Sequence, residues 1–293
     1  MTRPANVLER AFGTVTRVIR ALARTRSLTY ARLYWLARRT PRHVTGVFRF
    51  PFGDVHYVDA GTLPLMYFEI FVDRVYEIAG LTERPQIVDC GANIGLSTIW
   101  FKHRYPGAQI LAFEADPVIA GVLERNVKQL GLVSVHVERA AVTGNAGSVS
   151  FRSDGAIGGR VTSGQGTRIA SVRLTDCLAE PVDLLKLDIE GSEFDVIADL
   201  CASGKIRLVR NIVCEVHGRA EHAAPIGTLW QNLTQAGFRL AVRWAMSAAY
   251  PDVESPTPFP SMESGWFVLH LYAWRADTTG GTATNSIAQS DQS

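Results

Sequence analysis

Short apolar segments alternate with longer segments of helical periodicity over residues 86–275, a pattern typical of strands that alternate with helices. Seven apolar segments predict strands, at residues 87–90, 109–113, 133–138, 183–187, 212–216, 238–242 and 266–272. Strands linked through helices pair in parallel, and a parallel sheet is covered on both faces. The pattern therefore predicts an α/β fold whose ligands bind beyond the carboxyl ends of the strands.

Other segments depart from this alternation. A hairpin is predicted at residues 47–58, followed by a helix at residues 65–79. Residues 148–172, rich in glycine, serine and threonine, predict an irregular hairpin or loop, and the four prolines of residues 245–263 predict a long loop. That loop is either a substrate cover or a surface excursion. We expect an arm at residues 1–43, the hairpin and helix at 44–85, the main domain at 86–275 and a disordered tail at 276–293.

The N-terminal arm combines helical periodicity with many arginines. Residues 1–50 have a net charge of +10, whereas the rest of the chain has a net charge of −8. This asymmetry favours contact with an anionic membrane or nucleic acid, or with the protein's own acidic face. The arm is therefore predicted to form one or two basic amphipathic helices, which either pack on the domain or a partner subunit or lie on a membrane surface.

Composition narrows the class of protein further. A hydrophobic content of 47% and a charged content of 20% are typical of a soluble globular protein. No apolar run approaches the ~18 residues of a membrane-spanning helix, and the recurring arginines of the arm argue against a secretory signal. The four cysteines lie far apart without a C-x-x-C pair, which disfavours a disulfide framework and a zinc site. We therefore expect a cytoplasmic protein.

The strongest chemical signal is the motif I-V-D-C-G-A-N-I-G-L-S-T, which begins at residue 87. An apolar strand ends in Asp89, and then Gly91 and Gly95 permit a tight turn and the close approach of a ligand before a helix. The spacing differs from the G-x-G-x-x-G of dinucleotide-binding proteins, because Asn93 stands where the second glycine would be. A cofactor without a pyrophosphate therefore suits this turn.

Two further motifs place carboxylates at the same edge of the sheet. Glu114 follows the next strand, in A-F-E-A-D, where a carboxylate can accept hydrogen bonds from both hydroxyls of a ribose. The segment D-L-L-K-L-D-I-E-G-S-E, residues 183–193, ends an apolar strand with Asp188 and Glu190. Lys186 is expected to point to the opposite face of that strand and to be structural.

Together, the motifs D-C-G-A-N-I-G, F-E-A-D-P and L-L-K-L-D-I-E-G-S-E closely resemble those of the FkbM family of S-adenosylmethionine-dependent methyltransferases in order and spacing. The resemblance covers residues 87–217. It implies a Rossmann-like, seven-stranded class I methyltransferase sheet with helices on both faces, in which only the last strand, at about residues 265–274, is antiparallel.

The same resemblance implies S-adenosylmethionine as the cofactor and assigns its binding residues. The methionine part of the cofactor is expected against the turn that follows the first strand, and the ribose at Glu114. The adenine is expected against residues after the third strand, at Ala141 and Val142. The residues expected at the methionine part are Asp89, Gly91, Asn93 and Gly95.

The catalytic requirements of methyl transfer are modest. The sulfonium is already an activated leaving group, so the protein must mainly align the acceptor and remove its proton. Asp188 is the first candidate for this base, and His217, which ends the strand I-V-C-E-V-H, is the second unless it is a structural histidine. Glu190 stands beside them. A cationic sulfonium is sufficient to explain the carboxylates, so no metal is predicted.

The resemblance implies an O-methyltransferase that acts on a hydroxyl of a sugar, glycolipid or polyketide-like metabolite, the acceptors with which FkbM-like proteins are associated. Two alternatives stay open: an NAD-dependent oxidoreductase on a similar sheet, and a catalytically inactive membrane-associated module. Nucleic acid is a disfavoured partner, because the body that would surround a flipped base is acidic. If the arm binds lipid, the protein is expected at the inner face of the membrane.

Overall fold

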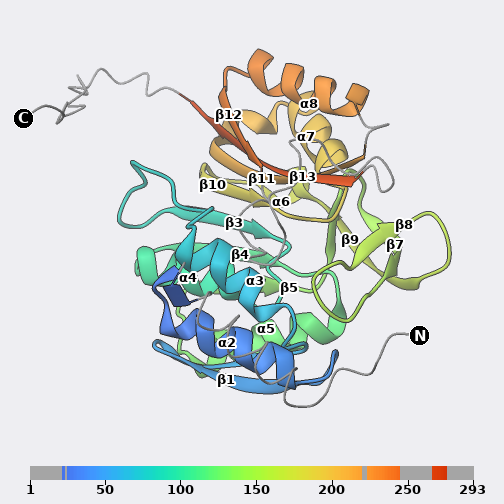
Figure 1. Cartoon of the computed structure of the whole chain (residues 1–293). Coiled ribbons are helices and arrows are strands. Elements are labelled where there is room, and N and C mark those ends of the chain that lie inside the picture. Colours follow the sequence, from blue (N-terminus) through green and yellow to red (C-terminus); the bar gives the residue numbers. More distant parts are fainter. Residues whose placement is uncertain (1–21, 24, 220–222, 245–265, 276–293) are drawn as a thin grey trace, which may run out of the picture.

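The computed structural model describes residues 22–23, 25–219, 223–244 and 266–275 (Figure 1). A seven-stranded sheet lies at the centre, with helices on both faces and a smaller sheet beside it. The predicted loop at residues 245–263, the predicted tail and residues 1–21 of the arm lie outside the described residues. Within the described part of the chain, no helix is long and apolar enough to span a membrane.

The central sheet has the predicted strands and the predicted direction of each. Its order is β12-β13-β11-β10-β3-β4-β5, and only β13 runs antiparallel to its neighbours. Each predicted strand is confirmed with small shifts of its ends. The bounds are β3 Gln86–Cys90, β4 Gln109–Phe113, β5 Val135–Glu138, β10 Val182–Leu187, β11 Val209–Arg219, β12 Arg239–Trp244 and β13 Trp266–Trp274.

Helices cover both faces of this sheet, as the unbroken apolar strands require. Helices α4 (Leu96–Arg104) and α5 (Pro117–Gln129) lie on one face, and α7 (Glu193–Ala202) and α8 (Ala223–Gln235) lie on the other (Figure 1). In β3 the successive residues Ile87 and Val88 belong to different hydrophobic clusters, one on each side of the sheet. The α/β fold class is confirmed.

The region at residues 148–172 is a regular sheet, so the prediction of an irregular hairpin or loop is wrong. Its order is β6-β9-β7-β8, with β6 (Ala141–Thr143), β7 (Gly147–Arg152), β8 (Arg160–Thr162) and β9 (Thr167–Arg173). Only Phe151 and Ile169 of β7 to β9, together with Ala141 of β6, form its small buried cluster. Because most of its other side chains are partly or fully exposed, the strands lack a strong apolar alternation.

The predicted hairpin is present, whereas the helix that follows it is shorter than predicted. Strands β1 (Gly46–Phe50) and β2 (Gly53–Tyr57) pair antiparallel. Helix α3 (Leu63–Tyr67) continues directly into a π-helix, η1 (Phe68–Val72), which ends seven residues before the predicted end at residue 79. The chain leaves the helical conformation at Arg74, whose φ of 53° no right-handed helix can continue.

The described part of the arm contains helix α2 (Leu28–Arg39), which packs one face on the domain. Ser27 caps its start by accepting a hydrogen bond from the Tyr30 amide at 3.2 Å. The ring of Tyr30 lies 5.7 Å from that of Phe68 on η1, and Leu33 joins the main hydrophobic cluster. The structure thus shows that one face of α2 packs on the domain. Membrane contact of the arm stays a prediction, and so do the domain boundaries.

Asn126 connects three segments around the first turn of the site. Its side chain, on α5, is completely buried. Its Oδ1 accepts a hydrogen bond from the His56 amide at 2.8 Å, and its Nδ2 donates to the carbonyl oxygens of His56 and Ile94 at 3.0 and 2.8 Å. One amide group therefore fixes the hairpin and the turn to the helix.

Replacing Asn126 with leucine removes these three hydrogen bonds and leaves two carbonyls and an amide without partners. Each unpaired buried group costs about 1–3 kcal/mol, so we expect the free energy of unfolding to fall by about 3 kcal/mol in urea titrations. Arg125→Leu, at an exposed position of the same helix, is the control and should change it by less than about 0.5 kcal/mol. Equal losses in both variants would contradict the role of Asn126.

Candidate active site

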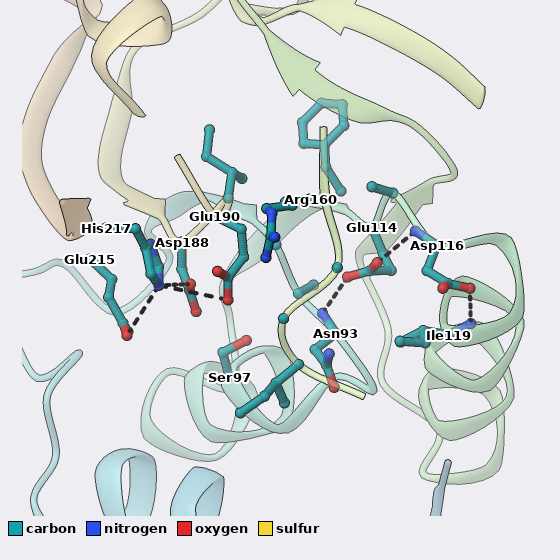
Figure 2. Close-up of a pocket in the computed structure, with 18 of the residues that line it drawn as sticks. Asn93, Ser97, Glu114, Asp116, Ile119, Arg160, Asp188, Glu190, Glu215 and His217 are labelled. Carbon is teal, nitrogen blue, oxygen red and sulfur yellow. Dashed lines mark hydrogen bonds and ion pairs between the residues drawn. The ribbon is translucent and has the colours of Figure 1, made fainter. Parts of the chain in front are cut away.

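A cavity of about 480 Å³ opens beyond the carboxyl ends of β3, β4, β10 and β11. Its size lies within the range of small-molecule sites. Figure 2 shows two polar groups of residues at its opposite ends: Glu114 and Asp116 on one side, and Asp188, Glu190, Glu215 and His217 on the other. The cavity therefore has the position that the strand pattern predicted.

The first turn contains two glycines that other parts of the chain require. Gly91 has a φ of 78°, and a Cβ at this position would lie 1.8 Å from the backbone oxygen of Asp188. Gly95 has a φ of 94°, and a Cβ there would lie 2.6 Å from Leu123 Cδ1 on α5. Gly91 lines the cavity, whereas Gly95 is not among the residues that line it. The backbone of Asp188 therefore requires glycine at position 91, and the positive φ favours glycine at position 95.

Asp89 lies behind the cavity wall. Its carboxylate is fully buried and accepts hydrogen bonds from Ser97 Oγ at 2.7 Å and Thr98 Oγ1 at 2.8 Å. The Lys186 ammonium lies 3.1 Å from its other oxygen. Of the residues expected to bind the cofactor, Asp89 and Gly95 do not line the cavity. Those that do are Gly91, Asn93, Glu114, Ala141 and Val142.

Glu114 is buried at the end of β4 and held by backbone amides. Its Oε2 accepts from the Asn93 amide at 2.9 Å, and its Oε1 accepts from the Asp116 amide at 2.8 Å. Burial raises the pKa of Glu114 to about 7, although both hydrogen bonds oppose that rise. Asn93 also donates from its side chain to the Ala156 carbonyl at 3.0 Å, which ties the segment between β7 and β8 to the turn.

The other end of the cavity is strongly acidic. His217 Nε2 faces three carboxylates, with Glu190 and Glu215 oxygens at 3.6 Å and an Asp188 oxygen at 4.0 Å. Its Nδ1 lies 3.0 Å from Glu193 Oε1. The fully buried Glu193 also accepts from the backbone amides of residues 189 and 191, so it fixes both the imidazole and the turn after β10.

Burial and mutual repulsion change the protonation of these groups. Burial, together with the charge of Glu215, raises the pKa of Asp188 to about 6. Burial also raises the pKa of Glu190 to about 8. Burial alone would lower the pKa of His217, but its contact with Glu193 and the charges of Glu190 and Asp188 raise this pKa well above its ordinary value. His217 is therefore cationic at neutral pH, and Asp188 is ionised.

Lys186 faces the cavity, so the prediction that it points to the opposite face of the strand from the site is wrong. Its Nζ donates to the carbonyl oxygens of Cys90 at 3.2 Å and Gly91 at 2.9 Å. It also lies 3.1 Å from an Asp89 oxygen and 3.7 Å from an Asp188 oxygen. Residues two apart in a strand share a face, so Lys186 and Asp188 lie on the same side.

Asp188, Glu190 and His217 also have the arrangement of a possible metal site. One ligand atom from each lies within 4.8 Å of the others. Carboxylate oxygens and an imidazole nitrogen are suitable ligands for several divalent ions. The cationic His217 is an alternative counter-charge for these carboxylates. The prediction of no metal therefore stays a prediction.

Comparison with known proteins shows the family to which the chain belongs. Residues 89–240 match the model of the methyltransferase FkbM domain. "Methyltransferase sdnD" of Sordaria araneosa is 33% identical over 194 residues, which cover 51% of this chain and 73% of that protein. "31-O-demethyl-FK506 methyltransferase FkbM" of Streptomyces tacrolimicus is 31% identical over 216 residues, 59% of this chain and 82% of that protein.

The chain belongs to the FkbM methyltransferase family. It is a methyltransferase whose methyl donor is S-adenosylmethionine, and the alternative of an NAD-dependent oxidoreductase is wrong. A crystal structure of an FkbM methyltransferase from Methylobacillus flagellatus KT aligns with 91% of this chain and 60% of its own, with a TM-score of 0.46 and 14% identity.

Part of the cavity wall lies outside the segment that matches the FkbM model. Glu69 of η1 and Tyr76 line the acidic end, although both precede residue 89. Burial and the charges of Glu215 and Asp188 raise the pKa of Glu69 well above its ordinary value. Arg160 of β8 lies between the two ends of the cavity (Figure 2). Sequence reasoning missed these residues, because each belongs to a segment whose pattern indicates only local structure.

Gly91→Ala tests the close approach at the first turn. The added Cβ would clash with the Asp188 carbonyl, so we expect lower stability and at least a tenfold loss of affinity for S-adenosylhomocysteine in calorimetry. Gly131→Ala is the matched control, because Gly131 also has a positive φ, of 61°, but nothing lies within 4 Å of an added Cβ. Gly131→Ala should lose only the stability that backbone strain at a positive φ costs, about 1–2 kcal/mol, and its affinity for S-adenosylhomocysteine should stay normal.

Glu114→Gln tests the raised pKa of the buried carboxyl. The folded state binds this proton more tightly than the unfolded state, with a pKa of about 7 against the ordinary 4.5. The stabilisation is therefore complete below the unfolded pKa and is lost as pH rises through the folded pKa. As pH rises from ~5 to ~8, the free energy of unfolding, measured in urea, should fall by up to about 3 kcal/mol more in the wild type than in the variant. Parallel pH profiles would exclude this assignment.

Proposed function

We propose that the protein is an O-methyltransferase that acts on a hydroxyl of a sugar, glycolipid or polyketide-like metabolite. The observation that carries the proposal is the acidic end of the cavity, where the ionised carboxylate of Asp188 lies beside His217, which is already protonated at neutral pH. A hydroxyl can donate a hydrogen bond to this carboxylate as it attacks. The similarity to "31-O-demethyl-FK506 methyltransferase FkbM", whose name specifies O-methylation, supports this choice of acceptor atom.

The cofactor would lie across the cavity from Glu114 to Asp188. We propose that Glu114 accepts hydrogen bonds from the ribose, through lone pairs that the amides of Asn93 and Asp116 leave available. The adenine would lie against Ala141 and Val142, which are buried and apolar. When bound, S-adenosylmethionine supplies a methyl group on a cationic sulfur. The carboxylates of the acidic end favour such a cation.

Asp188 is the proposed general base and His217 its positioning partner. A carboxyl with a pKa of about 6 is ionised at neutral pH and basic enough to take the proton that the hydroxyl loses as the C–O bond forms. His217 is already protonated at that pH, so it cannot be the first acceptor of this proton. Its charge instead adds to the larger effect of the Lys186 charge, and both keep Asp188 ionised beside Glu215.

The proposal also includes the location of the protein. We infer a cytoplasmic enzyme whose N-terminal arm makes peripheral contact with anionic lipid at the inner face of the membrane, near a lipid-linked acceptor. The net charge of +10 over residues 1–50, against −8 in the rest of the chain, supports this partner.

Asp188→Asn should reduce methyl transfer at least a hundredfold while affinity for S-adenosylhomocysteine stays within a few-fold of the wild type. The amide keeps the shape of the side chain but cannot accept a proton. Transfer is measured from isotope-labelled S-adenosylmethionine to glycan and lipid extracts of the host, and affinity by calorimetry. Glu138→Gln, at an exposed strand end, is the control and should leave both unchanged.

Three outcomes would contradict the proposal in different ways. Normal transfer by Asp188→Asn would remove this residue from the mechanism. Transfer to an amine rather than to a hydroxyl, seen as a methylated nitrogen by mass spectrometry, would overturn O-methylation alone. Cofactor binding by the wild type without transfer to any extract would favour a catalytically inactive module.

A further inference from the structure

Helix α2 presents an outer face that combines large apolar side chains with arginines. Leu28, Arg32, Trp35 and Arg39 follow one another at intervals of four, three and four residues, the spacing of one side of a helix. All four are exposed, with Leu28 at 70% and Trp35 at 45%. We call these four residues the outer face of α2. The opposite face holds Tyr30 and the other residues that pack on the domain.

Exposed apolar residues are concentrated in the stretch of sequence that contains this helix. Eight large hydrophobic side chains are exposed in the described part of the chain, and four of them lie between residues 28 and 47. Besides Leu28 and Trp35, these are Val44 and Val47, at 44% and 50% exposure. Single exposed apolar residues need no explanation, but this concentration marks an interaction surface.

The charge of the same region has one sign. Seven arginines and no aspartate or glutamate occur between residues 22 and 53. The Arg39 guanidinium lies 4.4 Å from the Trp35 ring centre, and that of Arg32 lies 5.1 Å from the Phe48 ring centre on β1. These stacked arginines keep their charge at the surface while their stems cover apolar side chains.

We propose that the outer face of α2 binds the surface of an anionic lipid bilayer. Tryptophan and leucine insert at the level of the headgroups, and arginines at the same level pair with phosphates. Nucleic acid would use the arginines but would leave Leu28 and Trp35 exposed to water. The proposal gives the membrane contact of the arm a defined surface, and it depends neither on the acceptor nor on catalysis.

The position of α2 connects this surface with the cavity. Tyr30, on the inner face, packs against Phe68, and the next residue in the chain, Glu69, lines the cavity. Leu65 and Met66 of α3 line it as well. A bilayer on the outer face would therefore lie on the far side of the wall that α3 and η1 contribute to the cavity.

Vesicle co-sedimentation of the full chain tests the proposal. We expect binding to vesicles of equal parts phosphatidylcholine and phosphatidylglycerol, and at least tenfold weaker binding to phosphatidylcholine alone. Leu28→Ser/Trp35→Ser and Arg32→Glu/Arg39→Glu should each weaken binding to the anionic vesicles at least tenfold. These side chains are exposed, so urea unfolding should show both variants as stable as the wild type.

Matched controls change the same kinds of residue elsewhere on the surface. Val118→Ser/Val133→Ser removes two other exposed apolar side chains, and Arg125→Glu/Lys128→Glu reverses two exposed charges of α5. Both controls should bind anionic vesicles as the wild type does. Equal losses in Arg125→Glu/Lys128→Glu and in Arg32→Glu/Arg39→Glu would show general electrostatic attraction and would overturn the proposal, as would equal losses in the two serine variants.

Other results would overturn it as well. If the wild type does not bind anionic vesicles, a lipid surface is excluded as the partner. If the variants of the outer face bind these vesicles normally, the outer face of α2 is excluded as the binding surface. If a fluorescent duplex RNA or DNA binds the wild type and competes with the vesicles, and if only the arginine variant weakens binding, the face binds nucleic acid instead. None of these results affects methyl transfer to a soluble acceptor, so they are distinguishable from a failure of the proposed catalytic function.

Discussion

One buried ammonium group holds the two chemical motifs of the cavity together. Lys186 lies between the carboxylates of Asp89 and Asp188 and donates to the carbonyls that end β3. Burial alone would lower its pKa, but the two carboxylates raise this pKa above its ordinary value, so the group stays charged. A charge in such a place is stable only while its partners stay in position. The cofactor turn and the proposed catalytic edge therefore depend on one another.

The acidic end of the cavity holds more carboxylates than its neighbouring cations can neutralise. Four carboxylates, from Glu69, Asp188, Glu190 and Glu215, line this end of the cavity, and the nearby cations are His217 and Lys186. Like charges in a desolvated space cannot all ionise, which is why several of these groups retain protons above their ordinary range. A cationic ligand would release those protons on binding. The site is therefore better suited to a positively charged donor than to an anionic one.

The inner strands of the central sheet could be predicted from the sequence because they are buried on both faces and read as continuous apolar segments. Glu114 and Asp188 were found for the same reason, since each directly follows such a strand. The predicted orientation of Lys186 was wrong because residues two apart in a strand share a face, so Lys186 points the same way as Asp188. Glu69 could not be found, because its contact with the cavity joins segments more than a hundred residues apart, and a helical pattern carries no sign of it.

The π-helix η1 has a consequence for how such a site can diversify. Its wider turn accommodates one more residue than an α-helical turn would, and Glu69 occupies part of that turn. Loss of a single residue from Phe68–Val72 would restore ordinary helical geometry and rotate the preceding residues by about 100° about the axis. Leu65 and Met66 would then turn away from the cavity, and other side chains of α3 would replace them. Changes of length at this one position, rather than substitutions in the sheet, offer a short route to a differently shaped cavity on an unchanged sheet.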